Sequence, residues 1–235
     1  IPNSVTSFAR DVFNGCSNLA SVTLSNSLKT IGGGSFRECT RLDSIIIPNS
    51  VTTIEDRVFE GCTKLSSITL GDSVSFIGND AFIGCDSLQR VEVTKLDVFF
   101  NEFHFGNNDN NPFSKASTLH VNGEEVTELV IPDGVEELNG GFFYNFGKNV
   151  TSVTIPNSVT KIGGSAFKDW TNLSQVTLGD SLETIGTAAF QGCTALESIV
   201  IPNSVTTIED RVFEGCTKLS YITLGDSLKT IGRWA

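Results

Sequence analysis

The 235-residue sequence has few of the features that carry membrane attachment or nucleic-acid binding. It has no apolar run near the roughly 18 residues that a membrane-spanning helix needs, and its N-terminus lacks the basic and then apolar pattern of a signal peptide. Basic residues are scarce, because 16 Lys and Arg stand against 27 Asp and Glu, a net charge of −11 at pH 7. Such a charge repels the phosphate backbone. We therefore expect no nucleic-acid partner and no membrane insertion within this segment.

Motifs of enzymatic and cofactor sites are missing as well. The sequence has no C-x-x-C pair, no G-x-S-x-G elbow and no G-x-x-x-x-G-K loop, which argues against a zinc site, a serine hydrolase and a phosphate-binding loop. The two histidines, His104 and His120, are separated by a predicted turn, and no nucleophile is placed beside either. We predict that the chain is not an enzyme and that it binds no cofactor and no metal.

What the sequence does contain is an internal repeat of about 23 residues. Apolar residues recur at steps of 23 or 24 on either side of one longer step, at Ile1, Leu24, Ile47, Leu70, Val93, Ile131, Ile155, Leu178, Ile201 and Leu224. The segment Ile47 to Ser73 recurs as Ile201 to Ser227 with one difference, Ser67 against Tyr221, which indicates duplication of a module. A period of this length predicts a solenoid in which each repeat forms one coil.

The end of each repeat predicts a short strand. The spacing L-x-x-V-x-L places alternate residues on one face of a strand, so these apolar residues should point into the core. Proline follows the strand in five copies, where its fixed φ and missing N–H turn the chain out of the sheet, at positions 2, 48, 132, 156 and 202.

Two further positions of the repeat are predicted to pack in ladders. Stacked coils bring equivalent residues about 5 Å apart, so one ladder should consist of phenylalanine rings, at Phe13, Phe36, Phe59, Phe82, Phe143, Phe167, Phe190 and Phe213. The short segment around each ring predicts a turn of helix or 3₁₀ helix. The second position holds Phe146 and Trp170 in two copies and cysteine in six, so it serves packing and we expect buried free thiols, at Cys16, Cys39, Cys62, Cys85, Cys193 and Cys216.

The unit I-P-N-S-V-T-x-I-G-x-x-x-F-x-G-C-x-x-L resembles that of the BspA-like leucine-rich repeat proteins, surface proteins of bacteria and some unicellular parasites. The resemblance covers nearly the whole chain. It implies a leucine-rich repeat solenoid, a curved right-handed superhelix with a parallel β-sheet on its concave face and with short strands and 3₁₀ or helical turns on its convex face. It also implies cell-surface display or secretion, attachment to host or matrix proteins, and no enzymatic activity.

The repeat is interrupted between Val93 and Ile131, where the step is 38 residues. Asn122-Gly123 tolerates positive φ at both positions and predicts a two-residue hairpin turn into a strand from Val126 to Ile131, and Asn-Pro-Phe at 111–113 stands where the usual turn with Phe is expected. We thus expect one continuous solenoid domain, a segment of a longer chain, made of regular repeats at 1–93, an irregular variant coil with a β-hairpin at 94–130, and regular repeats at 131–235.

Two features of the irregular stretch leave alternatives open. The Asn-rich loop at 107–111 offers oxygen atoms to calcium, but it has one carboxylate and no EF-hand spacing, so we favour a solvated turn. Aromatic residues are dense in the same stretch and fill the core of a longer coil or form an apolar binding patch, at Phe99, Phe100, Phe103, Phe105 and Phe113.

A protein partner would bind the concave sheet, where the two residues flanking the middle Val of L-x-x-V-x-L face outward. Most of these residues are Ser or Thr, which are not the Trp, Tyr and Arg anchors of strong interfaces. The larger or charged members are our candidate binding residues, Ile46, Arg90, Glu92, Gln175, Val200 and Tyr221. We predict a non-enzymatic protein-binding segment of a cell-surface protein that recognises an extracellular matrix or host surface protein. The alternative is a structural spacer that displays another domain away from the cell surface.

Overall fold

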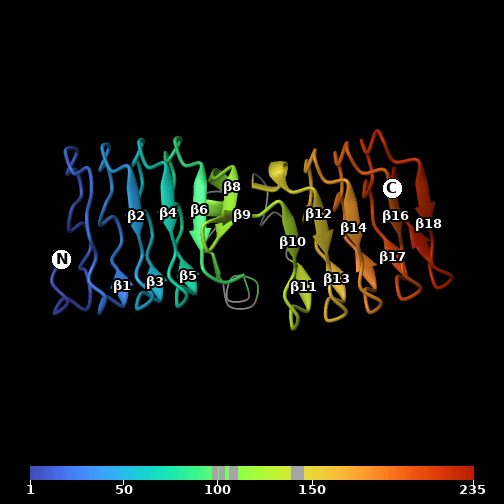
Figure 1. Ribbon diagram of the computed structural model, residues 1–235, viewed down its shortest axis with the longest axis horizontal. Helices are drawn as coiled ribbons and strands as arrows, with labels where there is room; N and C mark the ends of the chain where they lie inside the picture. Colours follow the sequence, from blue (N-terminus) through green and yellow to red (C-terminus); the bar gives the residue numbers. More distant parts are fainter. Residues whose placement is uncertain (97–99, 101–103, 106–110, 139–145) are drawn as a thin grey trace. The chain divides into compact units, whose positions relative to one another are not determined.

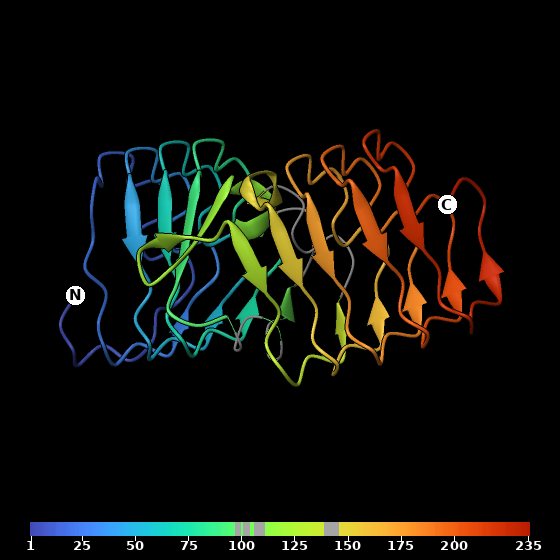
Figure 2. The same ribbon diagram turned by 45° about the vertical axis from the view of Figure 1, so that its right-hand side comes forward.

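The structure is a computed structural model that describes residues 1–96, 100, 104–105, 111–138 and 146–235. It divides into two compact units, which we call unit 1 (Ile1–Glu125) and unit 2 (Val126–Ala235) and describe separately. Within each unit the strands lie side by side in coil order, in parallel sheets with little helix (Figure 1, Figure 2). The predicted β-solenoid is therefore confirmed, whereas the single continuous domain remains a prediction.

Unit 1 contains two sheets. The long-strand sheet, formed at the L-x-x-V-x-L ends of the repeats, has the order β2-β4-β6-β8-β9, with bounds Ser44–Ile46, Ser67–Thr69, Arg90–Val93, Thr118–Val121 and Glu124–Glu125. The short-strand sheet has the order β1-β3-β5-β7, with bounds Thr30–Ile31, Thr53–Ile54, Phe76–Ile77 and His104–Phe105. Equivalent repeat positions pair across neighbouring parallel strands, as Ile45 with Ile68 and Ile68 with Val91.

Unit 2 repeats this arrangement. Its long strands form two sheets, β10-β12-β14 (Glu128–Val130, Ser152–Thr154, Gln175–Thr177) and β16-β18 (Ser198–Val200, Tyr221–Thr223). Its short-strand sheet has the order β11-β13-β15-β17-β19, with bounds Glu137–Leu138, Lys161–Ile162, Thr184–Ile185, Thr207–Ile208 and Thr230–Ile231. The 3₁₀ helix η1 spans Phe146–Asn149.

The core of each unit lies between its long and short strands. The middle residue of a long strand and the second residue of a short strand are buried, as Ile45 and Ile54 illustrate. Phenylalanine rings stack between the two layers as predicted, with centroid separations of 5.3, 5.6 and 5.1 Å from Phe13 through Phe36 and Phe59 to Phe82, and of 5.2 and 5.9 Å from Phe167 through Phe190 to Phe213. Phe143 lies outside the described residues.

The segment that leads to each ring is a series of hydrogen-bonded turns, not the turn of helix that we expected from the sequence. The residue two positions before the Phe has a left-handed φ of 54–66° in every copy whose residues are described, whether it is glycine, as Gly34, or not, as Arg57 and Ala188. A left-handed non-glycine residue costs about 1 kcal/mol. Hydrogen bonds between coils offset this cost, because the N–H of Phe36 donates to the carbonyl of Val58 at 2.9 Å and equivalent bonds recur along the stack.

The five cysteines that follow another coil form a ladder of buried thiols. Each thiol donates a hydrogen bond to the carbonyl of the ladder Phe in the preceding coil, at 3.0–3.2 Å. All six cysteines are free, and Cys16 is exposed. Burial raises the pKa of the Cys39 thiol to about 11 and that of Cys85 to about 12, and it also raises the pKa of Cys62, Cys193 and Cys216. This position therefore combines packing with a buried S–H donor.

A two-coil alternation lies on top of the 23-residue repeat. A coil that contains Ile-Pro-Asn is followed 23 residues later by a coil with a small residue in place of the proline, because a Cβ at Gly71 would lie 2.5 Å from the Pro48 carbonyl and one at Gly225 would lie 2.5 Å from that of Pro202. The Asn side chain then accepts a hydrogen bond from the next coil's backbone N–H, in the pairs Asn3 with Asn26, Asn49 with Asp72, Asn157 with Asp180 and Asn203 with Asp226, at 2.7–3.2 Å.

The irregular stretch of unit 1 contains the predicted turn but not the predicted second strand. Asn122 and Gly123 have φ values of 52° and 89°, and they join β8 to the antiparallel strand β9, Glu124–Glu125. The prediction that the hairpin leads into a strand at 126–131 was wrong. Residues Glu128–Val130 instead pair in parallel with β12 of unit 2, because their L-x-x-V-x-L pattern matches a regular coil.

Asn-Pro-Phe at 111–113 begins the short helix α2, Pro112–Lys115. The Asn111 side chain caps it by accepting hydrogen bonds from the N–H groups of Phe113 and Ser114, both at 2.8 Å. Phe113 is fully buried, so it belongs to the core and not to a surface patch. The Asn-rich residues 107–110 and the aromatic residues Phe99 and Phe103, which we considered for calcium and for an apolar patch, lie outside the described residues.

Candidate functional site

The outward face of the long-strand sheet of unit 1 consists of two rows of side chains. The parallel register aligns one row on β2, β4, β6 and β8 as Ser44, Ser67, Arg90 and Thr118, and the other as Ile46, Thr69, Glu92 and His120. Ile46 is an aliphatic residue in a row that is otherwise polar, and 68% of it is exposed. The structure therefore brings three of the predicted binding residues, Ile46, Arg90 and Glu92, onto one face.

Arg90 and Glu92 have a structural role besides lying on this face. The Arg90 guanidinium donates to the Glu92 carboxylate, and the other carboxylate oxygen accepts from the N–H of Gly123 in the hairpin turn at 2.6 Å. Burial alone would raise the pKa of Glu92, but the hydrogen bonds from Arg90 and Gly123 and the charges of Arg90 and His120 outweigh it, so that this pKa is lowered. The pair holds the hairpin against the sheet. Its signal in the sequence is the spacing R-x-E, which places both side chains on one face of a strand.

The long strands of unit 2 present the same two rows. One row contains Glu128, Ser152 and Gln175 on β10, β12 and β14, followed by Ser198 and Tyr221 on β16 and β18. The other contains Val130, Thr154 and Thr177, followed by Val200 and Thr223. Three of these side chains are apolar or aromatic and largely exposed, Tyr221 at 74%, Val200 at 64% and Val130 at 60%. Val130 was not among our predicted binding residues, although its aliphatic side chain at an outward position was visible in the sequence.

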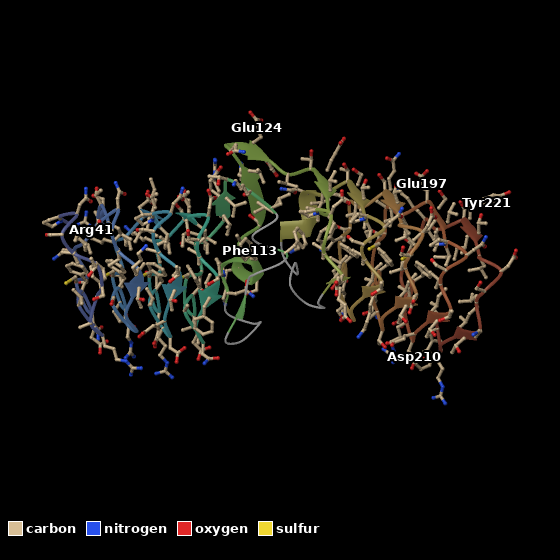
Figure 3. All side chains as sticks on the ribbon, turned by 90° about the horizontal axis from the view of Figure 1, so that it is seen from below. Arg41, Phe113, Glu124, Glu197, Asp210 and Tyr221 are labelled. Atoms are coloured by element: carbon tan, nitrogen blue, oxygen red, sulfur yellow. The ribbon has the colours of Figure 1, made fainter. Side chains whose placement is uncertain are left out.

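Tyr221 and Val200 line one shallow depression of about 460 Å³ across β16 and β18, together with Glu197, Ser198 and Thr223. Figure 3 shows Tyr221 and Glu197 on one side of unit 2 and Asp210 on the other. Since Tyr221 is the one residue that distinguishes the segment 201–227 from 47–73, this aromatic side chain is the local difference between two otherwise identical surfaces.

The described part of the chain offers little chemistry of other kinds. No group of three or more His, Cys, Asp or Glu residues able to hold a metal ion occurs there. His120 Nδ1 lies 3.4 Å from the Gly123 carbonyl, within the hairpin, and the side chain of His104 lies outside the described residues. None of the described helices is long and apolar enough to cross a membrane.

Comparisons with known proteins agree with the geometry. The family model described as BspA type leucine rich repeat region (6 copies) matches residues 1–111 and 118–235. A leucine-rich repeat protein from Bacteroides ovatus is 29% identical, over 99% of this chain and 67% of that one, with a TM-score of 0.58. The pneumococcal vaccine antigen PcpA is 23% identical, over 99% of this chain and 57% of that one, with a TM-score of 0.52, a likeness of fold alone. A search of curated proteins gave no match.

Proposed function

The chain belongs to the BspA-type leucine-rich repeat family, and we propose that it is a non-enzymatic protein-binding segment of a cell-surface or secreted protein. Its partner in this proposal is an extracellular matrix or host surface protein. The resemblance of the repeat to surface proteins supports the location. The outward faces of the long strands support the mode of binding, because they are regular, exposed and free of the chemistry that catalysis requires.

The observation that carries the proposal is the depression around Tyr221. A tyrosine supplies a large amphipathic contact area with few rotatable bonds, and tyrosine is enriched among the residues that dominate binding energy. Val200 lies beside it and adds aliphatic surface, while Ser198, Thr223 and Glu197 provide a polar rim. An interface usually has this arrangement of a few apolar anchors within a polar border.

The remaining predicted residues have different places in the proposed interface. Ile46 and Gln175 are exposed on the long strands and are free to contact a partner. Arg90 and Glu92 are partly buried and already bound to each other, so in this proposal they contribute a fixed charged edge and not a flexible anchor.

The test is binding of the purified chain to a panel of extracellular matrix and plasma proteins at physiological salt, measured by surface plasmon resonance. The decisive variant is Tyr221→Ser, because the chain itself contains this version of the segment at Ser67. Loss of an anchor tyrosine typically costs 2 kcal/mol or more, which is a roughly 30-fold weaker Kd. A matched control is Trp234→Ser, which removes another exposed aromatic side chain of unit 2 from outside the long-strand face.

Saturable binding that weakens in Tyr221→Ser but not in Trp234→Ser supports the proposal. Equal weakening in both variants would indicate non-specific adhesion of exposed aromatic side chains. Absence of binding across the panel would favour the alternative function, a spacer that displays another domain, which the many Ser and Thr residues of the outward rows favour.

A further inference from the structure

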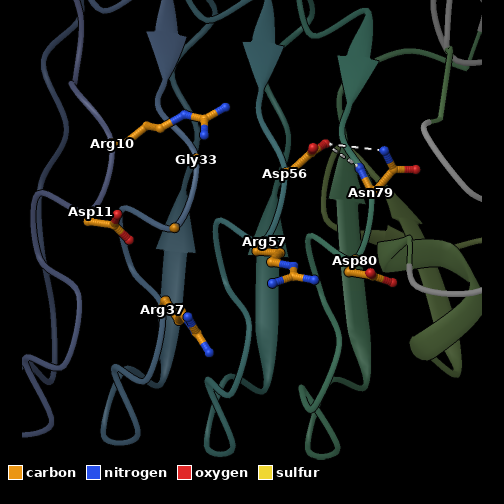
Figure 4. A pocket seen from close by; sticks show the side chains of 9 residues that line it. Arg10, Asp11, Gly33, Arg37, Asp56, Arg57, Asn79 and Asp80 are labelled. Atoms are coloured by element: carbon orange, nitrogen blue, oxygen red, sulfur yellow. Dashed lines mark hydrogen bonds between the residues drawn. The ribbon is translucent and has the colours of Figure 1, made fainter.

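A polar pocket of about 490 Å³ lies on unit 1, outside the surface proposed for protein binding (Figure 4). Three arginines, Arg10, Arg37 and Arg57, line it together with aspartates and the pair Gly33-Gly34. No residue of a long strand lines it. In unit 2 the equivalent of one lining residue, Asp56, is Asp210, which lies on the side opposite Tyr221 (Figure 3).

The pocket exists because glycine replaces a larger residue in one coil. The neighbouring segment Glu55-Asp56-Arg57 recurs unchanged as Glu209-Asp210-Arg211 in unit 2. There the preceding coil contains Thr187, whose N–H and hydroxyl both donate to the Glu209 carboxylate, at 2.9 and 2.8 Å. In unit 1 the equivalent residue is Gly33, whose N–H donates to Glu55 at 2.9 Å but which has no side chain to fill the space.

The arginines that surround this space have unused hydrogen-bond donors. Arg10 makes no ion pair with any residue that the structure describes. The Arg37 Nη2 lies 3.2 Å from Glu60, but its Nε is buried and makes no hydrogen bond within the protein. The Arg57 Nε lies 3.9 Å from Glu60, which is too far for a hydrogen bond.

Two of the aspartates, in contrast, accept hydrogen bonds from their own neighbours. Asp56 accepts from the backbone N–H of Asn79 at 2.7 Å (Figure 4), and Asp11 accepts from the Asn14 amide at 3.1 Å. The unused capacity of the pocket therefore lies mainly with donors. A ligand that satisfies it must supply acceptors, and a guanidinium binds planar or multi-oxygen anions best.

The cluster is specific to unit 1. Although the Glu-Asp-Arg segment is shared, the positions of Arg10, Asp11 and Arg37 are occupied in unit 2 by Gly164, Ser165 and Gln191. The two units thus offer the same fold and one shared arginine position, with and without the surrounding cationic groups. This difference provides an internal control.

We propose that the pocket binds an oxyanion, a carboxylate or sulfate group carried on an acidic sugar or present as a free ion. Arg10 and Arg57 contact the anion from the coils on either side of Gly33-Gly34, and the Nε of Arg37 donates to it. The volume lies in the range of small-molecule sites, roughly 300–1,000 Å³, and exceeds what one sulfate ion fills. An acidic sugar therefore uses the pocket more fully than the free ion does.

The test is isothermal titration calorimetry of the full chain with three probes, which are a sulfated disaccharide, its unsulfated parent and sodium sulfate. We expect binding of the sulfated disaccharide that weakens with added salt, since the contacts are charged and partly exposed. We expect Arg10→Ala and Gly33→Thr to weaken it at least 10-fold, the first by removing a donor and the second by restoring the side chain that unit 2 has at this place. Arg211→Ala, the matched control, should bind as the unaltered chain does.

Each result separates the possibilities. Binding of sodium sulfate as tight as that of the sulfated sugar would assign the site to the free ion, and weaker binding would assign it to the sugar. No binding of either, equal binding of the unsulfated sugar, or an unchanged affinity in Arg10→Ala would overturn the proposal. Circular dichroism of Gly33→Thr verifies its folding, and Arg10→Ala, which changes an exposed side chain, keeps the test valid if Gly33→Thr does not fold.

Discussion

Alkylation of the folded protein with N-ethylmaleimide at pH 8 should modify Cys16 and leave the other five cysteines unmodified. The reason is that the thiolate is the reactive form. At pH 8 an ordinary thiol with a pKa near 8.5 is about one quarter ionised. A buried thiol such as Cys39, with a pKa of about 11, is ionised to about one part in a thousand. Ionisation alone therefore slows its reaction by about 200-fold, and the full burial of the side chain slows it further.

Intact-mass spectrometry over time measures this difference directly. The spectrum should show one adduct within minutes, and peptide mapping should place it at Cys16. The remaining five thiols should react when urea unfolds the chain, since they become accessible only when a coil opens. Rapid modification of two or more thiols in the native protein would refute the buried ladder and the hydrogen bonds to the phenylalanine carbonyls.

Two further predictions concern stability, measured by urea unfolding. Phe59→Ala should destabilise the chain by about 4 kcal/mol, because the ring is fully buried and stacks on both Phe36 and Phe82; a loss below about 1 kcal/mol would contradict the ladder as a source of stability. Glu92→Gln should cost about 1 kcal/mol at pH 7, because it weakens the bonds to Arg90 and the hairpin. The lowered pKa of Glu92 means that this stability is present above about pH 4.3 and is lost as the pH falls through the folded-state pKa. The two proteins should therefore converge in strong acid, and a constant difference down to pH 2 would show that charge is not the cause.

Much of the fold could be predicted because its periodicity is strong. The phenylalanine ladder and the buried strand residues follow from spacing alone, since stacking one coil on the next leaves each repeat position a single environment. The second strand of the hairpin was predicted wrongly because the pattern around Leu129 fits both a hairpin strand and a regular coil. Pairing with β12 decided between them, and that pairing is not local in sequence.

The candidate surfaces could be predicted only in part. Outward residues such as Ile46 and Tyr221 were identifiable, because alternation in a strand fixes which side chains face out. The pocket around Gly33 could not be found in the same way, since its arginines come from three different coils and its volume depends on a missing side chain. Comparison of Gly33 with Thr187 in the duplicated surroundings is the sequence signal that would have revealed it.

The alternation of proline and glycine coils limits how the gene can change length. A duplication that adds one 23-residue coil would place a proline directly after another proline coil, where the close approach of Gly71 to the Pro48 carbonyl leaves no room for a ring. A duplication of 46 residues keeps every proline opposite a small residue and every Asn side chain opposite its backbone donor. Recombination that preserves the fold is therefore expected to add or remove regular coils in pairs.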